Sequence, residues 1–268
     1  MPNHLQFSFF ARTDIGLVRQ QNEDAIAVRE GLQLAVLADG MGGYNAGEVA
    51  SSIAIAVIPE EVERQLHENQ YHHPDDQVAM RRLCLMQAVR KANTEIILAA
   101  RKDPTCRGMG TTVVVAWLQQ TSICIAHVGD SRVYCLRKIG SDGELMQLTR
   151  DHSVLQEQID AGLVTPEEAT LAMNRNVITR AVGVDPQLTV EVHEYALQAG
   201  DLYLLCSDGL SDRLSADEIK RIIMGVNTDA DSDLGVASDA LILAANAAGG
   251  QDNISVILIE ATSIKNLA

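Results

Sequence analysis

The stretch LADGMGGYNAGE (residues 37–48) joins an apolar run to a turn of unusual composition. The run ends in a single acid, Asp39, and four of the next eight residues are glycine. An ordinary turn needs one or two glycines, and this one opens into a segment with apolar residues at helical spacing. The stretch therefore predicts a buried strand that carries a carboxylate to a crowded position, and then a helix, starting at Gly47 and Glu48, that covers the strand.

Three further acids occupy similar places in the chain. Asp130, Asp208 and Asp252 each stand at a glycine-marked end of an apolar run. The runs are short and continuously apolar, as expected for strands that are buried on both faces. One Asp-Gly pair after a strand is typical of a turn, so the functional interpretation depends on all four junctions together.

Carboxylates gathered at one end of a sheet repel each other unless a cation neutralises them. Oxygen ligands without cysteine or clustered histidine favour Mg²⁺ or Mn²⁺ over Zn²⁺. Two such ions about 3.5–4 Å apart form a centre that hydrolyses phosphate esters. The four strand-end acids therefore predict a phosphate-hydrolysing metal site.

The overall composition is that of a globular protein with an acidic surface. The 268 residues, 47% of them hydrophobic, are enough for one large domain or two small ones. The formal net charge of −15 would repel nucleic acid and anionic membranes. Aromatic residues make up only 3%, which leaves little material for base stacking, so we expect no nucleic-acid partner.

The cysteines and the apolar runs indicate in which cellular compartment the protein is expected. The five cysteines are odd in number and form no CxxC pair, which favours reduced, buried thiols. The N-terminal residues lack the basic and long apolar regions of a signal peptide. No apolar run approaches the ~18 residues of a membrane span. We expect a cytoplasmic protein without a membrane span.

Periodicity gives the order of the elements. The predicted strands are residues 6–12, 25–29, 32–38, 111–118, 122–127, 132–137, 144–148, 189–196, 201–206 and 254–260. The predicted helices are residues 48–69, 77–101, 215–224 and 234–247, and the polar segment 151–180, with a helix start at Thr165-Pro166, reads as an insertion over the sheet edge. Strands and helices do not alternate one by one, which favours antiparallel sheets covered by helices, an α+β protein.

Seven motifs in order carry a family resemblance. They are TDIGLVRQQNEDA (13–25), LADGMGGYNAGEVAS (37–51), GMGTTVVVA (108–116), AHVGDSRVY (126–134), LTRDHSV (148–154), GDLYLLCSDGLSD (200–212) and GGQDNISVILIE (249–260). In this order and spacing the chain resembles the metal-dependent (PPM) protein phosphatases of the PP2C type, in their compact bacterial form. The resemblance covers nearly the whole chain.

The resemblance implies a fold as well as an activity. It implies a four-layer αββα sandwich, with two antiparallel sheets flanked by helix pairs and the metals at one end of the sheets. The chain would be a single domain over residues 1–268, with its core at about 7–260 and a flap insertion at about 150–180.

The resemblance also implies a set of metal ligands. Asp39 corresponds to a carboxylate that bridges two metals, and the backbone carbonyl of Gly40 corresponds to a ligand of the second metal. Asp208 and Asp252 correspond to ligands of the first metal. Asp130, together with Asp208, corresponds to the ligands of a third, weaker site. The implied cofactor is Mg²⁺ or Mn²⁺, with two ions and a possible third.

Other positions correspond to residues around the metals. Arg19 is implied as the phosphate-binding residue, and its planar fork suits two phosphate oxygens. Glu23, Asp24 and Asn253 are implied as groups behind the ligands, the two acids orienting metal-bound waters. The implied reaction is in-line attack on phosphorus by a water shared between two metals, without a covalent phosphoenzyme.

The chain departs from the family at three places. Met41 replaces the histidine that eukaryotic relatives carry after Asp-Gly, and Tyr44 stands where several bacterial members have histidine. The group that protonates the leaving oxygen is therefore not assigned, although Tyr44 stays a candidate. Met173-Asn174 replaces a His-Pro pair in the flap, which concerns substrate preference rather than the metals.

Two histidines beside the motifs are expected to be structural. His127 precedes the VGD turn and reads as a packed strand residue, and His152 reads as a structural residue at the flap hinge. Gly108 to Thr112 is no P-loop, because the lysine of that motif is missing.

The leading hypothesis is a phosphoserine and phosphothreonine protein phosphatase. Its partners would be phosphorylated proteins, including a bacterial Ser/Thr kinase and the targets of that kinase, and we expect a monomer. Two alternatives stay open at this point: a non-catalytic phosphoprotein-binding scaffold on the same fold, and a two-metal phosphomonoesterase that acts on small molecules.

Overall fold

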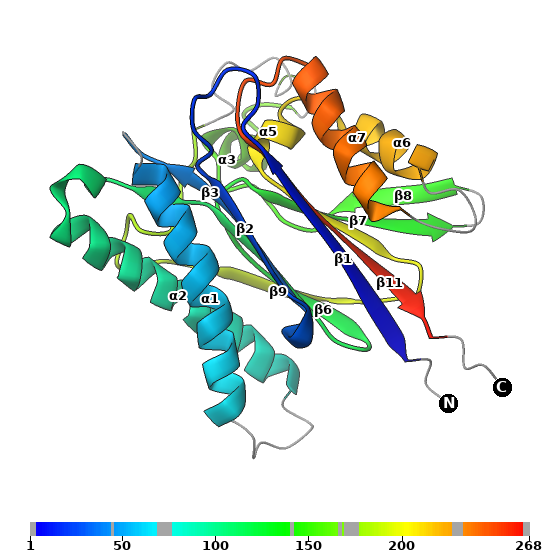
Figure 1. Cartoon of the computed structure of the whole chain (residues 1–268), viewed down its shortest axis with the longest axis horizontal. Helices are drawn as coiled ribbons and strands as arrows, with labels where there is room; N and C mark the ends of the chain where they lie inside the picture. The colour runs from blue at the N-terminus through cyan, green and yellow to red at the C-terminus, as the bar shows by residue number, and fades with distance from the viewer. Residues whose placement is uncertain are drawn as a thin grey trace.

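Two antiparallel β-sheets lie face to face, and a pair of helices covers the outer face of each (Figure 1). The computed structural model describes residues 4–43, 46–68, 77–139, 142–165, 168, 177–226 and 233–264. Helices α1 (Ala46–Glu68) and α2 (Gln77–Lys102) cover one sheet, and α6 (Ala216–Val226) and α7 (Leu234–Ala247) cover the other. The predicted four-layer α+β sandwich is confirmed.

The strand order interleaves distant parts of the chain. The first sheet runs β2 (Asp24–Arg29), β3 (Leu34–Met41), β5 (Val113–Leu118), β6 (Ser122–Val128) and β9 (Glu191–Ala196), and β4 (Gly110–Thr111) pairs with the end of β3. The second sheet runs β1 (Leu5–Asp14), β11 (Ile254–Ser263), β10 (Leu202–Cys206), β7 (Arg132–Ile139) and β8 (Asp142–Gln147). Short helices α3 (Val154–Asp160) and α5 (Asp208–Ser211) and the 3₁₀ turns η1 (Glu30–Leu32) and η3 (Pro104–Cys106) complete the described elements.

Strand β3 shows why the apolar runs are continuous. Leu34, Val36 and Ala38 pack on the helix side, whereas Ala35 and Leu37 pack on the second sheet. Successive strand residues alternate between faces, so a strand with a helix layer on one side and a sheet on the other needs apolar residues at every position. By the same alternation Asp39 continues the row that faces the second sheet.

Several boundaries differ from the sequence-based prediction at the site end of the molecule. Strand β3 continues through Asp39 and Gly40 to Met41, because β4 pairs Thr111 with Gly40. The predicted strand 111–118 is divided at Thr112, whose N–H donates to the Asp39 carbonyl at 2.8 Å. Helix α1 begins at Ala46, two residues before the predicted start, and the one-turn helix α5 after β10 was not predicted.

The predicted flap begins directly after β8. Ser153 caps α3 by accepting a hydrogen bond from the Gln156 N–H at 3.2 Å. Thr165 and Glu168 exchange backbone-to-side-chain hydrogen bonds of 2.9 and 3.2 Å, which is the capping box expected at a helix start. Pro166, Met173-Asn174 and the leaving-group candidate Tyr44 lie outside the described residues.

Two expectations about the chain as a whole can be compared with the structure. All five cysteines are buried and unpaired, as expected for reduced thiols. The part of the chain that the structure describes contains no helix with the length and hydrophobicity of a membrane span.

Candidate metal centre and active site

A cavity of about 260 Å³ opens at the end of the sandwich where β3 stops. It is lined by Arg19, Glu23, Asp39, Gly40, Met41, Gly42, Thr112, Asp130, Ile178, Asp208 and Asp252. The structure therefore brings together the four strand-end aspartates and Arg19. Asp24 and Asn253 do not line the cavity but lie directly behind its wall.

Asp24 and Asp39 come from the first sheet. They are directly opposite each other in the β2–β3 register, and both continue the rows that face the second sheet. The Asp39 backbone is fixed by both threonines of the β4–β5 break: its N–H donates to Thr112 Oγ1 at 3.2 Å, and its carbonyl accepts from Thr111 Oγ1 at 2.8 Å. The buried Asp24 Oδ2 accepts from Ser207 Oγ at 2.8 Å, so it bridges the two sheets.

The second sheet supplies Asp208 and Asp252. Asp208 is the first residue of α5, immediately after β10, and Asp252 precedes β11. Asn253 holds Asp252 and the 15–23 loop together: its N–H donates to Asp252 Oδ1 at 2.9 Å, and its side-chain amide donates to the carbonyls of Ile15 and Gln21. Asn253 Oδ1 also accepts from the Glu23 N–H at 2.8 Å.

Asp130 comes from the turn that crosses between the sheets, from β6 to β7. It is 8% exposed. The neighbouring Ser131 hydroxyl lies 2.7 Å from Thr112 Oγ1, which ties this turn to the residue that holds Asp39.

The aspartates carry more negative charge than the protein compensates. Burial, reinforced by the charges of Asp24 and Asp208, raises the pKa of Asp39 well above its ordinary value. Burial and the charge of Asp130 act in the same direction on the pKa of Asp208. Burial also raises the pKa of Asp24 and that of Asp130 to about 6. A divalent cation would remove this repulsion, so the donor set fits hard cations such as Mg²⁺ and Mn²⁺.

Arg19 is the cation at the rim of the cavity. Its Nη2 donates to Asp252 Oδ2 at 2.7 Å, and its side chain is 48% exposed. The hydrogen bond to Asp252 raises the Arg19 pKa further above its ordinary value, so the guanidinium is charged at any physiological pH. An exposed cation beside the acids is placed to meet an anionic group that enters the cavity.

The glycines of the opening stretch serve a packing role as well. A Cβ at Gly40 would lie 2.2 Å from the Gly47 carbonyl oxygen and 2.6 Å from that of Glu23. A Cβ at Gly47 would lie 2.5 Å from Glu23 Oε1. The glycines therefore let α1 contact the end of β3 and leave room for the Glu23 carboxylate. The resemblance implies that the Gly40 carbonyl binds a metal, and the structure adds this contact between helix and strand.

Some residues of the site were not predicted as members of it. Thr112 lines the cavity and holds Asp39, and Ser207 holds Asp24; both lie within quoted motifs but look like ordinary strand or turn residues. Asp212, one turn after Asp208, adds negative charge that raises the pKa of Asp208 and of Asp130. The available signal was its place at the end of the quoted 200–212 motif.

Comparisons with known proteins show which family the chain resembles. The family model described as protein phosphatase 2C matches residues 18–228. The serine/threonine phosphatase stp of Listeria monocytogenes is 34% identical over 255 residues, which are 93% of this chain and 94% of that protein. A crystal structure of the catalytic domain of the phosphatase PstP with two manganese ions is similar with a TM-score of 0.80 and 34% identity, covering 97% of this chain and all of that one. The phosphatase Stp1 of Staphylococcus aureus has a TM-score of 0.78 at 33% identity, covering 98% of this chain and 96% of that one.

The chain belongs to the protein phosphatase 2C family, the metal-dependent (PPM) class of the resemblance. It is accordingly a metal-dependent enzyme, a serine/threonine protein phosphatase of the PP2C type. The non-catalytic scaffold and the small-molecule phosphomonoesterase receive no support from the comparisons.

Proposed function

We propose that the cavity hydrolyses phosphoserine and phosphothreonine esters of proteins with two Mg²⁺ or Mn²⁺ ions, and that its substrates are products of a bacterial Ser/Thr kinase. The observation that carries the proposal is the convergence of Asp39, Asp130, Asp208 and Asp252 from both sheets on one cavity with Arg19 at its rim. The manganese ions of the similar PstP structure support the choice of cofactor. A third, weaker ion belongs to the same proposal.

Each residue has a proposed role that follows from its position. Asp39 would bridge the two ions, the Gly40 carbonyl would bind the second, and Asp208 and Asp252 would bind the first. Asp130, with Asp208, would bind the third. When bound, the ions would acidify a shared water so that it can attack phosphorus near neutral pH.

The chain's own groups orient the reactants around these ligands. Arg19 would bind the entering phosphate through its fork of N–H donors and oppose the charge that builds up on the transferring group. Its present partner is Asp252, so binding of a substrate would exchange one anionic partner for another. Asn253 and Asp24 would keep Asp252 and Asp39 in place, and Glu23, whose carboxylate faces the cavity, would orient water.

One assay tests the reaction and its cofactor. Purified protein is given a phosphothreonine peptide and p-nitrophenyl phosphate, with Mn²⁺, with Mg²⁺ and with a chelator, and released phosphate is measured. We expect release from both substrates with either metal and none with the chelator. No metal-dependent release from the peptide would refute the proposed function.

Three substitutions test the site. Asp39→Asn and Asp252→Asn are expected to lower kcat/KM by at least ~100-fold, because loss of ligand charge weakens the metal and the transition state together. Arg19→Ala is expected to raise KM for the peptide while metal affinity is retained. Wild-type activity of Asp39→Asn would show that the site is assigned to the wrong residues.

A further inference from the structure

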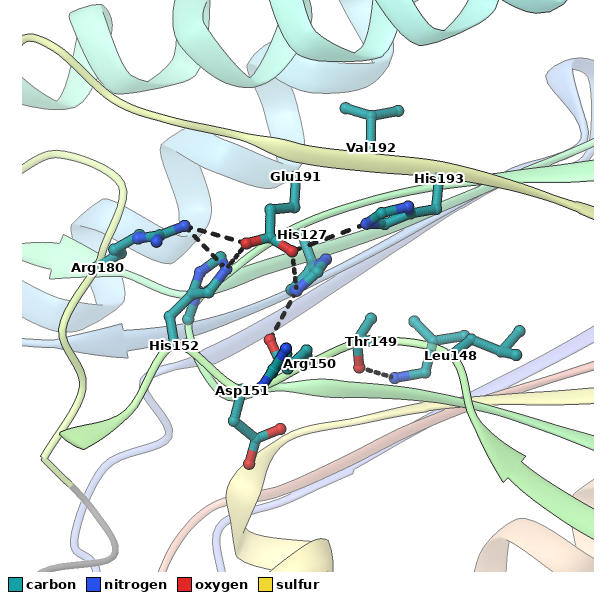
Figure 2. Close-up of polar contacts among 12 residues, drawn as sticks. His127, Leu148, Thr149, Arg150, Asp151, His152, Arg180, Glu191, Val192 and His193 are labelled. Carbon is teal, nitrogen blue, oxygen red and sulfur yellow. Dashed lines mark hydrogen bonds and ion pairs between the residues drawn. The ribbon is translucent and has the colours of Figure 1, made fainter. Parts of the chain in front are cut away.

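A polar cluster lies beside the β6–β7 turn, outside the set of proposed ligands, with its two histidines buried and Glu191 31% exposed. His127, His152 and Glu191 place their ligating atoms within 4.8 Å of one another, and the two imidazole rings stack with centroids 4.8 Å apart (Figure 2). The cluster already contains a cation, because Arg180 Nη1 lies 3.1 Å from Glu191 Oε1 and 3.3 Å from His152 Nε2. We therefore interpret the cluster as a hydrogen-bond network rather than as a second metal site.

The hydrogen bonds fix the tautomer of His152. The Gly129 N–H is 3.1 Å from His152 Nδ1 and can only donate, so Nδ1 is an unprotonated acceptor. The proton is then on Nε2, which donates to Glu191 Oε1 at 3.0 Å. The backbone N–H of His152 in turn donates to the Gly129 carbonyl at 3.0 Å. His152 thus binds both backbone polar groups of Gly129, the residue before Asp130.

The two residues before His152 are anchored to the strands that flank the β6–β7 turn. His127 Nε2 donates to the Arg150 carbonyl at 2.9 Å, which makes this ring an Nε2–H tautomer as well. The Arg132 guanidinium holds both carboxylate oxygens of Asp151 at 2.6–3.1 Å. Three consecutive residues at the start of the 150–180 segment therefore contact the turn that carries Asp130 or the strand residues beside it.

The C-terminal end of the 150–180 segment also contacts His152. The Thr179 N–H donates to the His152 carbonyl at 2.8 Å, and Ser153 forms a β-bridge with Ile178. Ile178 lines the cavity. Among the residues of this network, His152 alone contacts both the Asp130 turn and the two ends of the 150–180 segment. Through Glu191 it also contacts strand β9.

We propose that His152, oriented by Glu191, is a positioning residue that fixes the Gly129–Asp130 turn and so aims the Asp130 carboxylate into the cavity. Gly129 has a φ of +103° and packs so closely on Thr112 that a Cβ would lie 2.6 Å from the threonine Cβ. A turn this tight depends on its hydrogen bonds to keep one conformation. The inference rests on the proposed ligand role of Asp130, and it adds the group that makes this ligand available.

The test measures metal binding directly, with Mn²⁺ titrated into the metal-free protein by calorimetry. His152→Phe removes the acceptor but keeps a ring of similar size, whereas His152→Asn keeps an acceptor near the position of Nδ1. His193→Gln is the matched control, because His193 is on the same strand as Glu191 and 3.8 Å from it, yet 52% exposed. Asp130→Asn defines the effect of losing the ligand itself.

We expect His152→Phe to lower the Mn²⁺ affinity of the weaker class of sites by about tenfold, as is usual when a group that orients a ligand is lost. Asp130→Asn should lower the affinity of the same sites, and the affinity of the tight class should be unchanged in both variants. His152→Asn should recover part of the affinity, and His193→Gln should match wild type. If Asp130→Asn weakens the class but His152→Phe does not, the inference is wrong and the proposed function stands. If Asp130→Asn has no effect, the ligand role of Asp130 is wrong and the inference falls with it.

A second measurement decides the case if His152→Phe does not fold. In the wild-type protein, nitrogen-15 spectra of the histidine rings report which nitrogen carries the proton. The structure requires a bare Nδ1 and a protonated Nε2 at His152, and slow exchange of the Gly129 amide. The opposite tautomer, or an unprotected Gly129 amide, would overturn the inference without any measurement of activity.

Discussion

Asp24 and Asp39 stand directly opposite each other in the β2–β3 ladder, with both side chains directed between the two sheets. Like charges in this position destabilise a sheet. Ser207 Oγ donates a hydrogen bond to Asp24 Oδ2, whereas Asp24 Oδ1 is buried without a hydrogen-bond partner among the described residues. The pair is therefore a functional feature that lowers the stability of the metal-free protein.

Removal of one charge from this cluster should stabilise the metal-free enzyme. We expect Asp39→Asn to raise the Tm in chelator by a few degrees, since about 1 kcal/mol corresponds to roughly 2–4 °C for a chain of this size. Differential scanning calorimetry with and without Mn²⁺ measures the effect. The variant should also lose the stabilisation that Mn²⁺ gives the wild type.

The pH dependence of this effect has a definite sign. Burial raises the folded-state pKa of Asp24 and of Asp130 to about 6, so the folded protein binds more protons than the unfolded chain between about pH 4 and 6. Metal-free wild type therefore gains stability from these groups as the pH falls through this window. The advantage of Asp39→Asn should be larger at pH 7.5 than at pH 5, and an equal advantage at both would contradict the charge explanation.

Loss of the Ser207 hydroxyl should lower the free energy of unfolding. Ser207→Ala removes the donor to Asp24 and the acceptor of the Ser255 N–H, which is 3.0 Å from Ser207 Oγ. Leaving these buried groups unpaired should cost about 1–3 kcal/mol of unfolding free energy, measured by urea denaturation. Ser238→Ala is the control, because Ser238 Oγ is buried without a partner among the described residues; its loss should be neutral, and an equal cost in both variants would contradict the argument.

A methyl group at Gly40 should disrupt the contact between β3 and α1. In Gly40→Ala the new Cβ would meet backbone atoms of Gly47 and Glu23 at 2.2–2.6 Å, so backbone has to move, at a cost of about 1–3 kcal/mol or more. Gly43→Ala, three residues later, has nothing within 4 Å of its Cβ and should retain wild-type stability. Thermal denaturation of the two variants tests this, and equal melting temperatures would show that the contact is unimportant.

Burial of His127 should make the protein less stable in mild acid. Burial lowers the His127 pKa below its ordinary 6.5, so the unfolded chain takes up a proton first as the pH falls. Stability is then lost below about pH 6.5, until the folded-state pKa is reached. His127→Gln, whose amide can still donate to the Arg150 carbonyl, should lose less stability than wild type between pH 7.5 and 5.5. The comparison is made in chelator by urea denaturation, and identical losses would show that His127 does not contribute.

Residue patterns along the chain were enough to predict antiparallel sheets covered by helices and the four strand-end acids, and the family resemblance implied the four-layer sandwich. Apolar runs without alternation required strands buried on both faces, which two sheets between helix pairs provide. A glycine at the end of each apolar run indicated the positions of the four strand-end acids, Asp39, Asp130, Asp208 and Asp252. These features depend on residues close together in the chain, so composition and spacing can predict them. The proposed roles of the acids came from the family resemblance.

The contacts that hold these acids in place are visible only in the folded protein. The register that sets Asp24 against Asp39, the hydrogen bond from Ser207 across the sheets, and the contact of Gly40 with Gly47 all join residues far apart in the chain. The His152 network likewise depends on strand β9 passing beside the β6–β7 turn. A pattern of residue types along one chain does not fix which polar groups meet, because that depends on strand register and on the packing of one sheet against the other.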